Sequence, residues 1–247
     1  MHASYFGGLA SFDHLGVSRK INDQQVVALN LIRLGIDNIY NTTQLIDNQG
    51  NLDYSQLQTF NSADYALIGS FAKPTRVDHL SLGVSAKLIY RHIGNFAKAF
   101  GFGFDAGLQY RPSKFWSAGL NLRDATSTFS AWTYNLSPEM QTTFLETNNE
   151  LPQNGVEQML PRLVGGISGQ LPFKNGKYQI GGQLNIELTA DGPRNTLVSG
   201  SVFSLDPRAG LFFNYDNKLI LRTGVSQFQY YLNFDQTQKL SLQPHLG

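Results

Sequence analysis

The chain has 247 residues, no cysteine and a net charge of +1, with its lysines and arginines scattered along it. The lack of cysteine excludes thiol catalysis, disulfides and cysteine-based zinc sites, and the balanced, dispersed charge argues against nucleic-acid binding. No apolar run approaches the roughly 20 residues that a membrane-spanning helix requires. The many glycines, phenylalanines and tyrosines suit a β-barrel better than a helical domain.

Period-two alternation of apolar and polar residues predicts strands along most of the chain, in one domain covering residues 1–247. The predicted strands cover residues 1–6, 11–20, 25–34, 62–73, 79–92, 97–111, 115–124, 162–172, 177–189, 207–215, 218–228 and 238–247. In the third of these, Val26 and Val27 are adjacent and Arg33 shares the parity of Leu29 and Leu31. Which of its faces points inward therefore stays open.

The clearest element is the hairpin from His79 to Ser113, whose arms alternate between two kinds of side chain except at Ile89. One face is aliphatic and aromatic, whereas the other is small or polar, rich in glycine and carries isolated charges. A soluble barrel turns its apolar face inward, but a polar, glycine-rich face suits a crowded and wet lumen. The hairpin therefore predicts an all-β fold, a transmembrane antiparallel up-and-down β-barrel, although a soluble all-β protein fits the glycine content equally well.

The strands near residues 115–124 and 177–189 repeat these two faces. Six polar or charged residues are predicted to face the lumen: Lys87, Arg91, Asp105, Gln109, Arg123 and Glu187. We expect them to pair across strands and satisfy a closed interior, or to hold a plug or line a water path. Six aromatic residues are predicted to face outward, those near strand ends in interfacial girdles: Phe100, Phe102, Phe104, Tyr110, Trp116 and Tyr178.

The connections between the predicted strands sort by length. Those at residues 21–24, 74–78, 112–114, 173–176 and 216–217 fall at one end of the barrel and are short. Those at residues 35–61, 125–161, 190–206 and 229–238 fall at the other end and are long, with residues 93–96 as the short exception. Short turns at one end and long loops at the other are typical of outer-membrane barrels.

One long connection is predicted to contain a short helix from Ser137 to Glu146. Ser137 is placed as its N-cap and Pro138 at its first position, and Met140, Phe144 and Leu145 form an apolar stripe.

Neither an enzyme nor a cofactor site is predicted. The five histidines are separated and lack an HExxH motif, and the chain has no GxSxG elbow, no P-loop and no paired carboxylates. A calcium site is a weaker hypothesis, because Asp47, Asn48, Asn51 and Asp53 could gather oxygen ligands on one loop. A pair of Asx turns in a surface loop is the alternative, since the distal glutamate of an EF-hand is absent.

Several phrases resemble the PorV/PorQ family of outer-membrane proteins. They are LNLIRLGIDNIYNTTQL with GNLDY, FNSADYALIGSFAK, and SLDPRAGLFFNYDNKLILRTGVSQFQYYLNFD leading into LSLQPHLG. The resemblance covers nearly the whole chain from Ser4 and implies a FadL-like barrel of about fourteen strands, with about twelve visible here. Because no signal peptide follows Met1 and LSLQPHLG stops without a turn, we expect a fragment that lacks both ends of a longer precursor.

The resemblance implies a location in the outer membrane of a Gram-negative bacterium and a role in type IX protein secretion or surface attachment of cargo. Its partners would be outer-membrane lipid, a secretion pore and secreted cargo proteins, which would meet the loops at residues 35–61 and 125–161. A FadL-like transporter of hydrophobic small molecules is one alternative, and a soluble lipid-binding β-barrel is another. The sequence leaves the cargo or ligand open.

Overall fold

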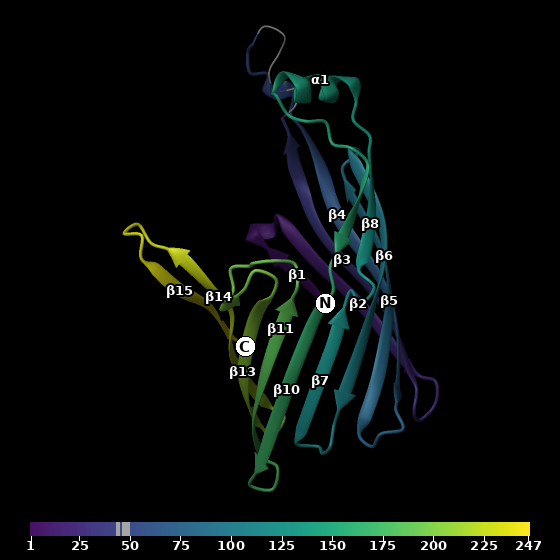
Figure 1. The fold of residues 1–247 in the computed structure, drawn as a ribbon, viewed down its shortest axis with the longest axis vertical. Coiled ribbons are helices and arrows are strands. Elements are labelled where there is room, and N and C mark those ends of the chain that lie inside the picture. The colour runs from purple at the N-terminus through teal and green to yellow at the C-terminus, as the bar shows by residue number, and fades with distance from the viewer. Residues whose placement is uncertain (43–44, 46–49) are drawn as a thin grey trace.

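The computed structural model describes residues 1–42, 45 and 50–247. Within these residues it is one antiparallel, up-and-down sheet of fifteen strands, with a single α-helix above one end (Figure 1). The strands are β1 (His2–Tyr5), β2 (Ala10–Lys20), β3 (Val26–Asn41), β4 (Gln58–Pro74), β5 (Leu80–Ile93), β6 (Ala97–Tyr110), β7 (Trp116–Arg123), β8 (Thr128–Tyr134), β9 (Gly155–Met159), β10 (Arg162–Phe173), β11 (Tyr178–Thr189), β12 (Val198–Ser199), β13 (Ser204–Tyr215), β14 (Leu219–Leu232) and β15 (Gln238–Leu246). The helix is α1 (Pro138–Glu146).

The all-β, antiparallel prediction is confirmed, and each predicted strand has a counterpart in the sheet. Three strands lie where only loops were predicted: β8 and β9 within residues 125–161, and β12 within residues 190–206. The connection predicted at residues 35–61 is also shorter, because β3 continues to Asn41 and β4 begins at Gln58. The loop lengths were therefore overestimated at this end.

An interruption between β7 and β8 explains why β8 escapes a pattern search. One half of β6 pairs with β7 and the other half with β8. Together β7 and β8 therefore occupy the place of one long strand beside β6, and residues 124–127 form a turn between them that does not pair with β6. Asp124 and Ser127 have φ angles of 53° and 62°, which fit a turn and not an extended chain. The turn ends the alternation on which the prediction depended.

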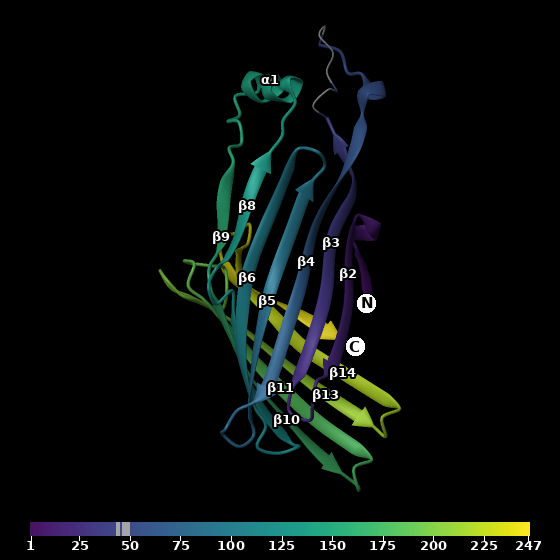
Figure 2. The same cartoon turned by 90° about the vertical axis from the view of Figure 1, so that its right-hand side faces the viewer.

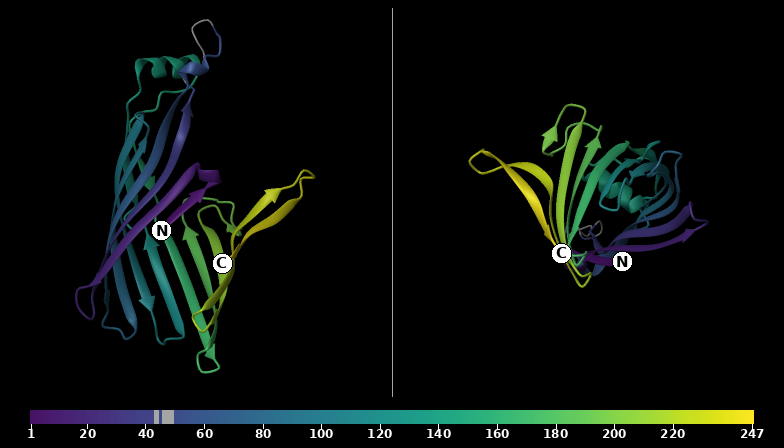
Figure 3. Two further views of the ribbon diagram at one scale, coloured as in Figure 1. Left: turned by 180° about the vertical axis from the view of Figure 1, so that it is seen from behind. Right: turned by 90° about the horizontal axis from the view of Figure 1, so that it is seen from below.

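The structure does not show closure into a barrel. The order β1-β2-β3-β4-β5-β6-β7-β10-β11-β13-β14-β15 leaves β1 and β15 as the two edges of the sheet. The sheet nevertheless curves so far that the two ends of the chain lie near each other (Figures 1, 2 and 3). The predicted antiparallel up-and-down topology is thus confirmed, whereas closure into a barrel and a transmembrane position stay predictions.

The predicted sorting of connections is confirmed in part. The connection predicted as long at residues 229–238 is short, because β14 continues to Leu232 and β15 begins at Gln238. The turns after β2, β4, β6, β10 and β13 are short, whereas the connections after β3 and β8 rise well beyond the opposite rim (Figure 2). The predicted helix is confirmed as α1, whose N-cap residue Ser137 accepts a hydrogen bond from the backbone N–H of Met140 at 3.3 Å. We call this end, which carries α1, the loop end.

The two faces of the sheet differ sharply in polarity. Arg91 on β5 reaches Glu157 on β9 across β6 and β8, at 2.8 Å, which is possible only on the inside of a curve, so the polar face is concave. Most large apolar side chains lie on the convex face, where Leu88, Phe100 and Ile167 are 62%, 63% and 55% exposed. The pair Arg33 and Asp13 is an exception, because its register with Tyr65 puts it on the convex face near the loop end. Among the described residues, the buried apolar side chains are three alanines only: Ala63, Ala97 and Ala99.

Aromatic side chains form two bands on the convex face. At the short-turn end, Tyr178 contacts Phe173, Tyr215 and Phe213, with ring centroids 5.3, 5.1 and 6.2 Å apart. We call these four rings the basal belt. The ammonium groups of Lys174 and Lys177 on the adjoining turn lie 5.4 Å from the rings of Tyr178 and Tyr215.

The second band lies near the loop end and is called the upper belt. It consists of Tyr65, Tyr90, His92 and Phe100, with centroids 4.8 Å apart for Tyr90 and Phe100 and 6.3 Å for Tyr65 and Tyr90. The predicted outward position of the aromatic residues of β6 is confirmed. From Phe100 to Tyr110, which lies at the short-turn end, β6 rises about 33 Å along its own axis at ~3.3 Å per residue.

Candidate functional site

The concave face carries a chain of ion pairs that crosses six neighbouring strands. Lys87 Nζ lies 2.8 Å from Asp105 Oδ1 and 2.5 Å from Asp124 Oδ1. Arg162 bridges the other oxygen of Asp124, at 3.3 Å, and Glu187, at 3.5 Å. Arg208 then contacts Glu187 at 2.8 Å. We call these six residues, Lys87, Asp105, Asp124, Arg162, Glu187 and Arg208, the central charge cluster.

Asp124 is the centre of this cluster and owes its position to the turn between β7 and β8. Its backbone N–H donates to Asp105 Oδ1 at 2.8 Å, and its carboxylate accepts from the hydroxyl of Thr128 at 2.5 Å. The side chain is only 3% exposed. A buried carboxylate needs paired charges and hydrogen bonds to offset its lost hydration, and Asp124 has both.

Gly103 on β6 makes room for Thr128. A Cβ atom at Gly103 would lie 2.0 Å from Thr128 Oγ1, too close for any side chain without movement of Thr128. We expect Gly103→Ala to displace Thr128 and to lower the free energy of unfolding by about 1–3 kcal/mol, measured by urea titration of the folded protein. Gly107→Ala is the matched control on the same strand and face, because its nearest neighbour is 3.4 Å away. Equal losses in both variants would contradict this account of Gly103.

A second cluster lies nearer the loop end and is called the upper cluster. Arg91 pairs with Asp64 at 3.0 Å and with Glu157 at 2.8 Å, and its guanidinium lies 4.8 Å from the ring centroid of Trp132. The indole N–H of Trp132 donates to the same Glu157 at 2.9 Å. This arrangement fastens β9 to β5 across the concave face.

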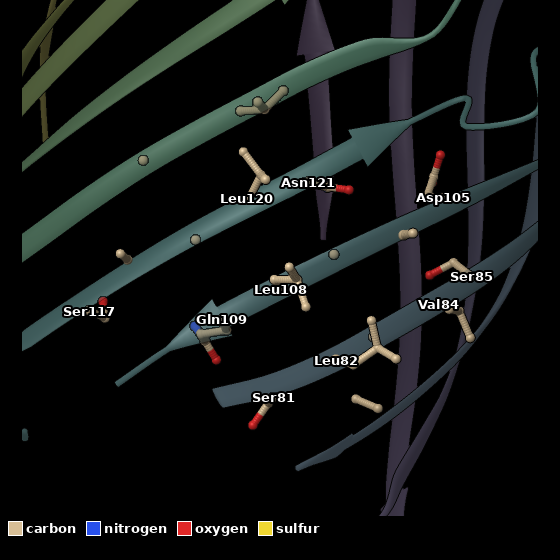
Figure 4. A pocket seen from close by; sticks show the side chains of 18 of the residues that line it. Ser81, Leu82, Val84, Ser85, Asp105, Leu108, Gln109, Ser117, Leu120 and Asn121 are labelled. Atoms are coloured by element: carbon tan, nitrogen blue, oxygen red, sulfur yellow. The ribbon is translucent and has the colours of Figure 1, made fainter. Parts of the chain in front are cut away.

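Below the central charge cluster, towards the short turns, the concave face forms a hollow of about 550 Å³ (Figure 4). Small and polar side chains such as Ser81, Gln109 and Asn121 line it. Two hydroxyl pairs span neighbouring strands in this wall, Ser70 with Ser85 at 2.8 Å and Ser117 with Ser168 at 2.7 Å. We call it the basal hollow.

The six residues predicted to face the lumen all lie on the concave face, but in different surroundings. Lys87, Asp105 and Glu187 belong to the central charge cluster, and Arg91 belongs to the upper cluster. Gln109 lines the basal hollow, whereas Arg123 lines a separate cavity and makes none of the ion pairs found in the described part of the chain.

Sequence reasoning missed three members of the central charge cluster. Arg162 and Arg208 fall on the small, polar parity of β10 and β13, so strict alternation could have found them. Asp124 carried no such signal, because the turn that places it is not periodic.

The calcium hypothesis concerns a loop that is described only in part. Asp47 and Asn48 lie outside the described residues. Asp53 caps a short 3-10 turn, accepting hydrogen bonds from the backbone N–H and hydroxyl of Ser55 at 2.9 and 2.6 Å, which is the Asx-type arrangement of the alternative. Across residues 1–42, 45 and 50–247, no three His, Asp or Glu side chains are grouped so as to hold a metal ion. The calcium site, which also includes Asn51, stays a prediction.

One further ion pair lies outside the strands, in the connection between β11 and β12. Arg194 donates to both carboxylate oxygens of Asp191, and this contact holds the pKa of Asp191 below its usual value.

In the described part of the chain, no helix is long and apolar enough to cross a membrane. No protein-family model matches the chain, and no curated protein matches its sequence.

Proposed function

We propose that the chain is a non-enzymatic outer-membrane β-barrel protein of the PorV/PorQ type, which acts in type IX protein secretion or in surface attachment of cargo. The observation that carries the membrane location is the inverted distribution of side chains. Large apolar groups are exposed on the convex face, while Asp124 and Glu187 are buried on the concave one. Water disfavours such a surface and lipid favours it.

The two aromatic belts support the same location. Tyrosine and tryptophan are enriched where a bilayer meets water, and lysines at strand ends reach towards the aqueous side. The two belts lie towards opposite ends of the strands, as the aromatic girdles of outer-membrane barrels do. A sheet in lipid must leave no edge unpaired, so the proposal requires the edges at β1 and β15 to be paired, directly or through other strands.

The concave face favours a protein-handling role over the two alternatives. A soluble lipid-binding barrel needs an apolar interior, and a transporter of hydrophobic molecules needs an apolar path. The basal hollow is instead lined by a mixture of hydroxyl, amide and aliphatic groups, and the two charge clusters cross the face above it, so no continuous apolar path runs along this face. The loop end, with α1 and the connection after β3, then offers the surface at which cargo would bind.

The test of this function replaces a segment at one end of the sheet and, in a separate variant, a segment at the other end. Replacing α1 (Pro138–Glu146) by a flexible Gly/Ser linker should reduce cargo release in cells and copurification with the secretion pore. The matched control replaces the turn at residues 174–177, at the opposite end. Both variants should keep the heat-modifiable gel migration of a folded barrel. Unchanged secretion after loss of α1, together with fatty acid retained by the purified protein, would favour the transporter.

A further inference from the structure

The concave face carries a second cavity near the loop end, of about 620 Å³, above the ends of β10, β11 and β13. Four arginines line it: Arg123, Arg162, Arg194 and Arg208. The acidic residues in its wall are Glu187 and Asp206. Two of the four arginines are also paired with carboxylates outside the lining, Arg162 with Asp124 and Arg194 with Asp191, and Arg208 pairs with Glu187 and Asp206. Arg123 is therefore the arginine of this cavity that has no carboxylate partner in the described chain, and it can attract an anion.

Three of the lining residues form a row across adjacent strands. Arg123 on β7 lies directly opposite Arg162 on β10, and Arg162 lies directly opposite Thr189 on β11. Like charges directly opposite each other on a sheet repel. Arg162 has Asp124 and Glu187 as counterions, but Arg123 makes no ion pair within the described chain, so Arg123 is the arginine of this row that lacks a counterion.

Two buried polar atoms at this cavity are also without partners. Thr189 is 4% exposed, and its hydroxyl, which lies near the carboxylate of Asp191, makes no hydrogen bond of normal geometry. One carboxylate oxygen of Asp206, Oδ1, is likewise buried and unpartnered, while its other oxygen accepts from Arg208. A buried polar group without a partner costs free energy, and both of these line the cavity.

We propose that this cavity binds a solute that carries an oxyanion, a phosphate or a carboxylate, together with hydroxyl groups. The oxyanion accepts hydrogen bonds from Arg123 and from the hydroxyl of Thr189, and it supplies the counterion that Arg123 lacks. A hydroxyl of the solute donates to Asp206 Oδ1. The volume exceeds that of a bare ion and suits a small phosphorylated or carboxylated polyol. This site goes beyond the proposed function and does not depend on it.

The test measures binding of glycerol 3-phosphate, glycerate, inorganic phosphate and glycerol by calorimetry, with the folded protein in phosphatidylcholine vesicles. Glycerol 3-phosphate or glycerate should bind more tightly than phosphate, and glycerol should not bind. Arg123→Gln and Thr189→Val should each weaken binding, the first by about tenfold because a charge-assisted hydrogen bond is lost. Arg123→Lys should restore it in part, because the charge returns without the planar guanidinium.

The control variant is Arg76→Gln, which removes one arginine from a turn at the opposite end and should leave the affinity unchanged. Circular dichroism confirms that each variant is folded. Vesicles that contain phosphatidylglycerol distinguish the source: competition by the lipid assigns the site to a headgroup, and unchanged affinity assigns it to a free solute. The proposal is overturned if none of the anions binds, or if Arg123→Gln binds as tightly as the parent protein.

Discussion

Replacing Asp124 by alanine is expected to lower the free energy of unfolding by about 3 kcal/mol, because it removes the buried carboxylate that joins two partly buried cations. Lys87, whose side chain is 13% exposed, keeps only Asp105, and Arg162 keeps only Glu187. The hydroxyl of Thr128 also loses its acceptor while it stays buried. A buried charge that loses its partner costs more than an exposed one, since water cannot replace the interaction.

The loss should appear as a lower midpoint of urea unfolding for the protein folded in vesicles. Asp124→Asn, which keeps the shape and one acceptor, should fall between the parent and Asp124→Ala. The matched control is Asp64→Ala on the same concave face, because Asp64 is 43% exposed and its partner Arg91 keeps a second carboxylate, Glu157. That change should cost about 0–1 kcal/mol. Equal midpoints for Asp124→Ala and Asp64→Ala would show that the central charge cluster does not stabilise the fold.

A charge on the convex face is expected to prevent insertion into a bilayer. Leu122 lies on this face of β7, opposite Ala106 of β6, about midway between Phe100 and Tyr110. Leu122→Arg should destabilise the inserted protein by about 2–4 kcal/mol, the cost of an arginine facing lipid at the midplane. The yield of heat-modifiable, protease-resistant protein after refolding into vesicles measures it.

Asn121 provides the control, because it neighbours Leu122 in the same strand and lines the basal hollow on the concave face. Asn121→Arg adds the same charge at nearly the same height and should insert with a yield close to that of the parent. If both variants inserted equally well, the convex face would not contact lipid. If only Asn121→Arg failed, the two faces would be assigned the wrong way round.

Much of this fold could be predicted from the sequence because alternation is a local property. In β5 and β6 every second side chain reports the face of its own strand, and no distant contact is needed to read it. The helix α1 was predictable for the same reason, since Ser137 and Pro138 mark its start. The strands β8 and β9 were missed because the turn at residues 124–127 and the short loop between β9 and β10 interrupt the alternation.

The site was less predictable than the fold. Lys87 and Asp105 share the concave parity, so alternation was enough to place both there. Asp124 enters the cluster through a turn of left-handed residues, and its partner Arg162 is 38 residues away in the sequence. The contact between Asp124 and Arg162 depends on which strands pair, and so does closure of the sheet. Neither the contact nor the closure can therefore be predicted from the alternation within a single strand.

The most direct test of a lipid-facing convex surface is site-specific labelling of single introduced cysteines. The chain has no cysteine of its own, so a thiol-reactive label attaches only at the introduced position. Single cysteines at Leu82, Val84 and Leu88 on the convex face of β5, and at Ser81 and Ser85 on its concave face, would carry an environment-sensitive fluorophore in vesicles. The account predicts blue-shifted emission that is quenched by brominated lipid at the three convex positions only. Equal emission at all five positions, or lipid quenching at Ser81 and Ser85 instead, would contradict it.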